Sequence, residues 1–489
     1  MFDRPVPADE YGLKCPGGGR MAVVLAPFEV RGTTRHVAGL WPFGCGSGSP
    51  LVGIPMGQHQ VTGAVVCADP INWFEAGLLS NPNLFVAAQP GLGKSTAVRR
   101  MVLGYSYQGI TTLVLGDLKP DYADLVAALG GQVVQVGPGR HRINPLDAGP
   151  WRRALPKLGP EEARILRDDV VSRRRALLEA LGGLTRGQSL TDRESTVLAA
   201  VCEYLTERER DVQPTLGDVI ATIQQAPDEV RAATLDLGDH QHWYQKVEGL
   251  LETLNALQKG AFGRMFDGQT TVPMDLDAPA VTIDISSIGE TDEKLTVAAL
   301  ITMWGHGFAQ VELAHRLAEQ GLAPKRRFFA VMDELWRALR APGLVDRLDA
   351  LTRLSRAKGT GLAYISHGLD DLEALPAEHD RAKARGIAQR CAMKLFGGLS
   401  LDQLDRIKAS LFPLSRSEVA ALSSWAQQDS GITTAAAERA VQQGSAGRGN
   451  FMIKTGAGTP GIPLKTVPTG PELALGNTDA RFNMVGAAS

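Results

Sequence analysis

Residues 88–96 read Ala-Gln-Pro-Gly-Leu-Gly-Lys-Ser-Thr, and they stand between the apolar run 84–87 and a stretch with a helical pattern. A strand, a glycine-rich turn, a Gly-Lys-Ser triplet and a helix in this order are typical of a phosphate-binding loop. Successive backbone N–H groups and the helix N-terminus form a nest that binds phosphate oxygens. The motif therefore predicts a nucleotide as the ligand and a parallel α/β sheet as the scaffold.

Individual positions of this loop have predicted roles. The Lys94 ammonium reaches the β- and γ-phosphates of the nucleotide, and the Ser95 hydroxyl holds Mg²⁺. The first glycine of the usual pattern is replaced by Ala88, which is tolerated if that residue needs no positive φ. We expect the nucleotide to be bound by Ala88, Gln89, Pro90, Gly91, Leu92, Gly93, Lys94, Ser95 and Thr96.

The composition is that of a globular protein. The 489 residues carry a formal net charge of −2, so no overall basic field indicates nucleic acid. The start of the chain lacks the apolar core of a signal peptide, and no stretch is apolar for long enough to span a membrane. The few cysteines are scattered without CxxC spacing, which indicates a reducing compartment and no zinc site. We expect a protein without a transmembrane segment that is cytoplasmic, or peripheral at the inner face of the membrane.

Hydrophobic periodicity divides the chain into regions. Residues 1–80 are rich in Gly and Pro with short β-like pieces, whereas 151–259 carry apolar side chains at helical spacing. Elsewhere strands alternate with helices, which is typical of a parallel sheet covered on both faces. We predict an α/β fold with a RecA-like P-loop NTPase core at 81–150 and 260–470. An all-helical insertion, a small β-rich N-terminal region and a C-terminal tail at 471–489 complete the chain.

Runs of apolar and β-branched residues mark the individual strands of this core, and apolar side chains at helical spacing mark its helices. The predicted strands are 84–88, 111–116, 132–136, 280–285, 327–332, 360–365 and 391–396, with a further short strand at 21–25. The predicted helices are 95–107, 121–129, 291–319 and 343–357, and residues 451–453 and 462–465 are expected to form a closing hairpin.

A second nucleotide motif follows the apolar run 328–332, where the strand ends in Asp333-Glu334. In this position Asp333 orients Mg²⁺, and Glu334 polarises the water that attacks the γ-phosphate. The alternative is an acidic strand end that caps the next helix. Paired with the loop at 88–96, the catalytic interpretation is favoured. The chain has no Asn-Lys-x-Asp base reader, so ATP is the expected nucleotide.

Further motifs occur in a fixed order along the chain: Asp-Leu-Lys-Pro-Asp-Tyr at 117–122, Leu-Gly-Gly at 129–131 and Ile-Asn-Pro-Leu-Asp at 143–147. They are followed by Gly-Ala-Phe-Gly at 260–263, Phe-Asp-Gly at 266–268, Met-Asp-Glu-Leu-Trp at 332–336, and the segment 353–367. This succession resembles the VirB-four or TraC-like energising ATPases of type IV secretion and conjugation systems, in the FtsK–HerA superfamily of P-loop motors. The resemblance covers 83–470.

The resemblance implies a ring-forming motor, expected to be a hexamer, that hydrolyses ATP with Mg²⁺. Its partners would be membrane-channel components of a secretion or conjugation apparatus, and the transported polymer would be DNA or protein. A cytoplasmic DNA translocase or helicase of the HerA or FtsK kind, acting in DNA processing, packaging or defence, is the alternative.

Two further catalytic positions follow from the resemblance. The strand after Asp-Glu usually ends in a Gln that senses the γ-phosphate, and the matching position here is His367, which can also donate a hydrogen bond. The alternative is a helix-capping Ser366 followed by an exposed histidine. In a ring, Arg356, ahead of Arg353 and Lys358, is the candidate arginine finger that reaches the neighbour's γ-phosphate. The alternative is a basic helix face.

Other polar residues have two open interpretations each. Asp117, Lys119 and Tyr122 stand at a strand's C-terminal end, where α/β sheets place ligands, or they form a polar turn that caps a helix. Asn144-Pro145 fixes an extended turn or belongs to the site. The triplet 173–175, three consecutive arginines, is interpreted as a solvated helix face in preference to a DNA or subunit contact.

Overall fold

A computed structural model describes two short strands near the N-terminus and most of the chain from residue 50 onward. The described residues are 8–9, 12–13, 50–235, 239–260, 262–288, 292–334, 337, 339, 359–373, 375, 378–426, 447–456 and 459–475. The chain divides into two units, Met1–Ser47 and Gly48–Ser489. In the first unit, β1 (Ala8–Asp9) pairs with β2 (Gly12–Leu13) in a small antiparallel hairpin.

The second unit is built on one sheet of eleven described strands in the order β4-β3-β13-β12-β11-β5-β10-β9-β6-β8-β7. Strands β11 to β7 in this order run parallel, and the four strands β12, β13, β3 and β4 continue the sheet antiparallel. The strands are β3 (Pro55–His59), β4 (Val65–Cys67), β5 (Asn83–Ala87), β6 (Thr111–Asp117), β7 (Gln132–Gln135), β8 (Ala280–Asp284), β9 (Phe328–Met332), β10 (Thr360–Ser366), β11 (Met393–Phe396), β12 (Asn450–Lys454) and β13 (Ile462–Thr466).

The parallel strands are apolar on both faces because helices cover both. In β9, Phe328 and Met332 belong to the core on the side of α12 (Glu293–Glu319), whereas Phe329 and Val331 belong to the core on the side of α3 (Lys94–Tyr107). All five residues of this strand are buried. A continuous apolar run of this kind is typical of a central strand in a doubly covered parallel sheet.

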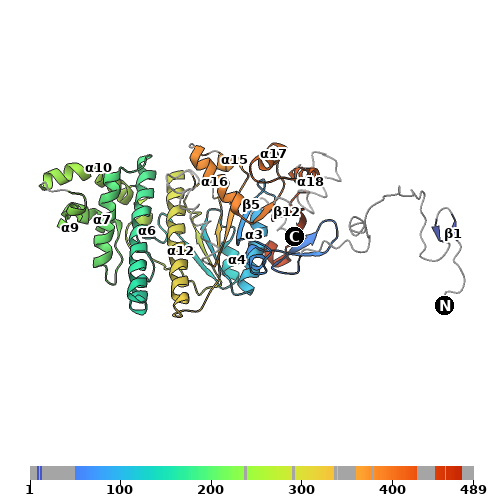
Figure 1. The fold of residues 1–489 in the computed structure, drawn as a ribbon, viewed down its shortest axis with the longest axis horizontal. Coiled ribbons are helices and arrows are strands. Elements are labelled where there is room, and N and C mark those ends of the chain that lie inside the picture. The colour runs from blue at the N-terminus through green and yellow to red at the C-terminus, as the bar shows by residue number, and fades with distance from the viewer. Residues whose placement is uncertain are drawn as a thin grey trace, which may run out of the picture. The chain divides into compact units, whose positions relative to one another are not determined.

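The helices between β7 and β8 form the region at one end of Figure 1. That region holds α5 (Trp151–Ala154), a 3₁₀ turn (Leu155–Lys157), α6 (Pro160–Arg186), α7 (Asp192–Arg208), α8 (Leu216–Gln225), α9 (Asp228–Ala233), α10 (His240–Lys259) and α11 (Gly263–Phe266). The other helices are α2 (Pro70–Glu75), α4 (Ala123–Ala128), α15 (Asp370–Glu373), α16 (Glu378–Arg390), α17 (Leu401–Ser410), α18 (Arg416–Ala426) and α20 (Gly470–Ala474).

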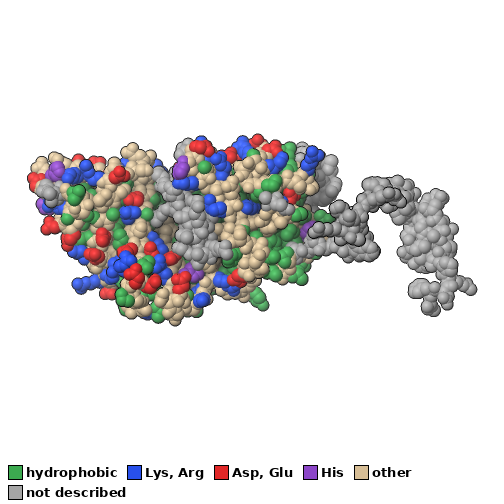
Figure 2. Space-filling view, in the orientation of Figure 1, with side chains coloured by type: hydrophobic (Ala, Val, Ile, Leu, Met, Phe, Trp, Pro, Cys, Tyr) green, Lys and Arg blue, Asp and Glu red, His purple; other side chains and the backbone are tan. Residues whose placement is uncertain are grey.

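The helical region is attached to the sheet through α6 and α12, which lie side by side in Figure 1. The face of this region seen in Figure 2 carries acidic and basic side chains intermixed, without an area of a single sign. No helix among the described residues is both long and apolar enough to cross a membrane.

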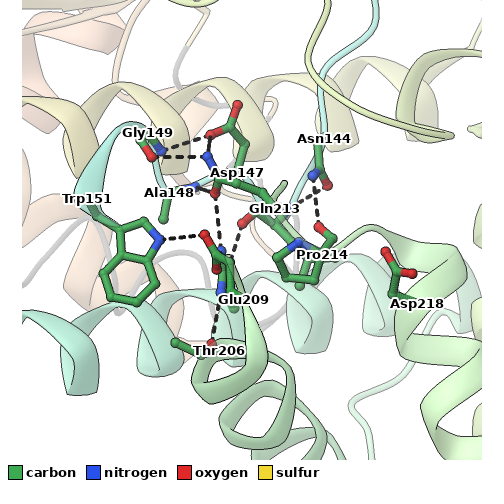
Figure 3. A network of polar contacts seen from close by, with 12 residues as sticks. Asn144, Asp147, Ala148, Gly149, Trp151, Thr206, Glu209, Gln213, Pro214 and Asp218 are labelled. Atoms are coloured by element: carbon green, nitrogen blue, oxygen red, sulfur yellow. Dashed lines mark hydrogen bonds and ion pairs between the residues drawn. The ribbon is translucent and has the colours of Figure 1, made fainter. Parts of the chain in front are cut away.

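A buried polar network holds the helical region to the segment that follows β7. The Arg174 side chain of α6 forms an ion pair with Glu209 at 2.7 Å, and both side chains are only 2% exposed. The Arg174 guanidinium also donates to the carbonyl oxygen of Leu146 and the hydroxyl of Thr206, each over 2.8 Å. Trp151 Nε1 donates to the other oxygen of Glu209 over 3.0 Å (Figure 3).

The same network uses the motif at 143–147. Gln213 Nε2 donates to the Asp147 carboxylate over 2.6 Å, and Asn144 Nδ2 donates to the Pro214 carbonyl over 2.8 Å (Figure 3). The Asn144 side chain also accepts from the N–H of Leu146, which fixes the turn. These side chains connect the helical region to the segment that follows β7. None of them lines the cavity beside the loop at 88–96 that is described below.

Several sequence predictions can be compared with this fold. The α/β class with a mostly parallel sheet is confirmed, as is the closing hairpin, which is the antiparallel pair β12–β13. The interpretation of 173–175 as a solvated face was wrong for Arg174, because its carboxylate partner is supplied from α7's C-terminal end, far along the chain. Strands β3 and β4, which precede the P-loop, join the main sheet through β13. The predicted strand at 21–25 and helix at 343–357 lie outside the described residues.

Candidate functional site

The parallel register brings four loops to one edge of the sheet. Ser366 at the end of β10 pairs with Ala87 at the end of β5, and on its other side Tyr364 pairs with Met332 at the end of β9. In β6, Val114 pairs with Val331, so Asp117 lies near the level of Glu334. Because carboxyl ends of parallel strands meet at one edge, the loop at 88–93, Asp333, His367 and Asp117 converge there.

The phosphate-binding loop connects β5 directly to α3. Gly91 and Gly93 have φ angles of 79° and 94°, a backbone region that residues other than glycine rarely adopt. Gly93 is the N-cap of α3, so Lys94 is the first residue of this 14-residue helix. The N-terminal N–H groups of the helix are directed toward the loop, as in other anion-binding helix starts. Ala88, at the position usually occupied by glycine, is not among the residues with positive φ.

Backbone hydrogen bonds hold the loop on both sides. Gln89 N donates to the carbonyl of Gly398 over 3.0 Å, and the carbonyl of Leu92 accepts from Gly449 N over 2.9 Å. The Ala88 carbonyl accepts from Lys94 Nζ over 2.7 Å. Of the nine predicted loop residues, these three serve the loop's own framework, and the other six line a cavity.

That cavity has a volume of about 330 Å³, the size of a small-molecule site. It is lined by Pro90, Gly91, Gly93, Lys94, Ser95, Thr96, Arg99, Asp117, Leu118, Lys119, Asp121, Asp333, Glu334, His367 and Arg448. The structure thus brings together the predicted lysine, serine, aspartate, glutamate and histidine. Arg356 lies outside the described residues, as do Arg353 and Lys358.

Lys94, His367 and Glu334 form a continuous chain of polar contacts across the cavity. Lys94 Nζ lies 2.6 Å from His367 Nδ1, and His367 Nε2 lies 3.3 Å from Glu334 Oε1. An ammonium group only donates hydrogen bonds, so Nδ1 must be the acceptor. The ring hydrogen is therefore on Nε2, directed at the Glu334 carboxylate.

The backbone of Glu334 is strained. Its φ is 51°, in the left-handed region that costs a residue with a side chain about 1–2 kcal/mol. The Glu334 N–H donates to Asp333 Oδ1 over 2.9 Å, which helps to hold this conformation. Strain of this kind is concentrated at functional sites, where the surrounding structure enforces it.

Burial shifts the pKa values of Lys94 and Asp333, which both line this cavity. Burial lowers the pKa of Lys94 to about 8, although the carboxylates of Asp333 and Glu334 oppose this shift. Burial, with Glu334 as the next cause, raises the pKa of Asp333 to about 6. Both shifts have burial as their main cause, and perturbed titratable groups of this kind are typical of functional sites.

The Asp117 loop reaches both predicted metal-binding residues. The carboxylate of Asp117 accepts from the N–H groups of Asp121, over 3.2 Å, and Tyr122, over 2.9 Å. Tyr122 Oη then donates to Asp333 over 3.4 Å, and the Ser95 hydroxyl lies close enough to Asp121 to favour the charged form of its carboxyl group, which lowers its pKa against the effect of burial. These two N–H groups lie just before α4, which spans Ala123–Ala128 and so begins later and ends earlier than the predicted helix at 121–129.

The donor set fits Mg²⁺ bound together with a nucleotide. Mg²⁺ keeps several waters and takes one or two oxygens from the protein plus phosphate oxygens, so it needs no complete cage of protein ligands. Among the described residues, no group of three or more His, Cys, Asp or Glu is arranged to hold a metal by itself. Ser95 and Asp333 lie in the same cavity, and burial raises the pKa of Asp121, which a nearby dication would reverse.

Four lining residues were not predicted from the sequence as part of the site: Arg99, Leu118, Asp121 and Arg448. Asp121 belongs to the motif at 117–122, and its spacing from Asp117 was the only sequence signal that it would lie near Ser95. Arg448 stood in no motif, and its only signal is the Gly-Arg-Gly sequence before β12.

The strand order defines the class of protein. The P-loop strand β5 and the Asp-Glu strand β9 flank β10, the arrangement of a RecA-like P-loop ATPase fold. The fold is similar to that of VirB4 of Thermoanaerobacter pseudethanolicus, with a TM-score of 0.62 and 19% sequence identity over 87% of this chain and 98% of that chain. The predicted resemblance to the VirB-four ATPases is thus confirmed in the fold.

Weaker similarity extends to the plasmid coupling protein TrwB. Its complex with ADP and Mg²⁺ gives a TM-score of 0.46 at 12% identity, over 84% of this chain and 90% of that chain. Its complex with the ATP analogue ADPNP gives 0.48 at 13% identity, over 84% and 89%. No protein-family model matches the sequence, and no curated protein matches it.

Proposed function

We propose that this protein is an ATP-hydrolysing, ring-forming motor that energises the transfer of DNA or protein in a conjugation or type IV secretion-like system. The observation that carries the proposal is the contact chain Lys94–His367–Glu334 beside Ser95 and Asp333 in one cavity. The fold shared with VirB4 and the ordered motifs from 117 to 367 support the secretion or conjugation setting.

In this proposal the nucleotide's phosphates lie on the backbone N–H groups at the start of α3, with Lys94 at the β- and γ-phosphates. Ser95 and Asp333 hold Mg²⁺, which neutralises charge on the phosphates when bound. Glu334 accepts a proton from the attacking water. His367 is the proposed γ-phosphate sensor, and its Nε2 donates a hydrogen bond to an oxygen of the γ-phosphate when the nucleotide is bound.

A ring is part of the proposal because Arg356 would complete the site of a neighbouring subunit. An arginine supplied in trans stabilises the charge that develops on the γ-phosphate, a contribution worth roughly 10³-fold or more in turnover. ATPase activity per subunit should therefore rise with protein concentration as rings assemble.

The experiment is steady-state ATP turnover over a hundredfold range of protein concentration, with and without DNA, and with Arg356→Ala as a variant. Turnover that rises with concentration, ignores DNA and falls in the variant supports a ring serving a channel. Strong stimulation by DNA would instead favour the translocase alternative. Turnover per subunit that is independent of concentration and of Arg356 would contradict the ring.

A further inference from the structure

The nucleotide cavity is bordered by a turn that no sequence motif marks, at residues 447–450. In this turn Asn450 N donates to the carbonyl of Gly447 over 3.2 Å, and β12 begins at Asn450. The turn follows α18 in the described part of the chain and packs against the P-loop. Arg448 at its centre lines the cavity together with Lys94 and Ser95.

Hydrogen bonds fix the backbone of this turn relative to the P-loop. Gly449 N donates to the carbonyl of Leu92 over 2.9 Å, one residue before the glycine that precedes Lys94. On the other side, Lys465 Nζ donates to the Arg448 carbonyl over 2.6 Å, and Thr466 N donates to the Gly449 carbonyl over 2.8 Å. The backbone of Arg448 is thus held between the phosphate loop and β13.

Steric constraints on both neighbours of Arg448 keep the turn in this place. A Cβ on Gly447 would lie 1.8 Å from the Trp425 carbonyl oxygen, which is far inside van der Waals contact. A Cβ on Gly449 would lie 2.7 Å from Thr466 Oγ1, and the φ of Gly449 is +78°. Because only glycine fits at either position, the turn presents the single side chain of Arg448 to the cavity.

The cavity that Arg448 lines is otherwise rich in negative charge. Four carboxylates, Asp117, Asp121, Asp333 and Glu334, line the space into which an anionic polyphosphate must enter. Arg448 is exposed although its two neighbours are buried, so packing alone does not require a guanidinium there. A guanidinium stays charged at all physiological pH values and offers a planar fork of donors that matches phosphate oxygens.

We propose that Arg448 is a phosphate-binding residue of the nucleotide site that acts from the same chain, beside the predicted finger from a neighbour. This inference rests on the proposed binding of ATP at the P-loop.

The test uses isothermal titration calorimetry on the full chain with two ligands, MgATP and inorganic tripolyphosphate, the second lacking the base and ribose. Arg448→Gln should weaken both ligands about tenfold or more, as expected for loss of a charge-assisted contact. Arg448→Lys should fall between Arg448→Gln and wild type, because it keeps the charge and loses the fork. Melting temperatures measured without ligand show whether either variant also affects folding.

Arg416→Gln is the matched control, since Arg416 is an exposed arginine at the start of α18 that does not line the cavity. Wild-type affinity in Arg448→Gln, with Lys94→Ala unable to bind ATP, would overturn this inference and leave the proposed nucleotide site intact. Weaker ATP binding with unchanged tripolyphosphate binding would also overturn it, because the contact would be to the base or ribose. Failure of wild type to bind ATP would overturn both.

Discussion

The Lys94 ammonium lies 2.6 Å from Nδ1 of His367, and this contact connects the P-loop helix to the end of the neighbouring strand β10. A phosphate that enters the cavity is a stronger partner for the ammonium than a neutral ring nitrogen, because the contact becomes an ion pair. His367, whose Nε2 faces Glu334 in the ligand-free structure, would then lose its contact with Lys94 and could turn toward the γ-phosphate. The occupancy of the site is in this way linked to the position of the glutamate.

Replacing His367 tests this link. His367→Ala should leave ATP affinity within a few-fold of wild type and lower kcat by roughly 10²-fold, because a hydrogen-bond donor near the developing charge is lost. His367→Gln should retain most of kcat, since an amide also donates. Steady-state kinetics with His379→Gln, an exposed histidine of α16, as control measure this. Equal loss of kcat in the Ala and Gln variants would refute a donor role.

The affinity for ATP should depend on pH through Lys94. Burial lowers the pKa of Lys94 to about 8 in the nucleotide-free protein, and phosphates bind the protonated form. Above pH 8 each binding event must first take up a proton, so Kd should rise about tenfold per pH unit. Below pH 7 this dependence should vanish, because the lysine is already charged.

Titrations from pH 6.5 to 9.5 on wild type and Lys94→Arg measure this dependence. The arginine stays charged throughout, so the variant should bind more weakly but with a flatter pH profile. Asp117, whose pKa burial also raises to about 8, is present in both proteins, and the comparison isolates the lysine. A wild-type Kd that is constant across the range would contradict the prediction.

The Asp121 carboxylate, which lies in the same cavity as the Ser95 hydroxyl, should govern Mg²⁺ affinity. A carboxylate that accepts the hydroxyl hydrogen makes the serine oxygen a better metal ligand, and such supporting groups are worth roughly 10- to 100-fold in metal affinity. Asp121→Ala should therefore raise the Mg²⁺ concentration for half-maximal ATPase activity about tenfold. An unchanged Mg²⁺ requirement would show that Asp121 has only a structural role.

Tyr122 should act on the same metal through Asp333, to which its hydroxyl donates over 3.4 Å. Tyr122→Phe is expected to shift the Mg²⁺ requirement less than Asp121→Ala, because the contact is long and the ring remains packed. Tyr107→Phe, which removes a hydroxyl from a side chain that is 94% exposed, is the control. A larger shift in Tyr122→Phe than in Asp121→Ala would reverse the assigned order.

The stability of the protein should depend on the buried pair Arg174–Glu209. Glu209→Gln leaves a buried guanidinium without its counter-charge, a change that costs about 3–5 kcal/mol of unfolding free energy. Glu161→Gln, which breaks a fully exposed pair with Arg164 on the same helix, should change little. Urea unfolding of both variants checks this, and similar midpoints would contradict the role of the network.

The sequence predicts the parts of the site that are local in the chain. The loop at 88–96 and the Asp333-Glu334 pair are short motifs, and the strand or helix beside each can also be predicted from the sequence. The parallel register then brings the two motifs together. Arg448 and Arg174 were out of reach for a physical reason. Arg174 pairs with Glu209 from the end of another helix, and Arg448 lines a cavity whose other residues lie far earlier in the chain. Neither the arginine triplet at 173–175 nor the Gly-Arg-Gly sequence at 447–449 shows which distant residues they meet.

The Glu334→Gln variant tests the central claim most directly, through MgATP affinity and steady-state turnover measured on the same preparation. The amide keeps the size of the side chain and removes its ability to accept a proton. We expect ATP to bind within a few-fold of the wild-type affinity and turnover to fall by at least 10²-fold. Turnover equal to wild type would contradict the assignment of Glu334 as the base, and with it the proposed hydrolytic site.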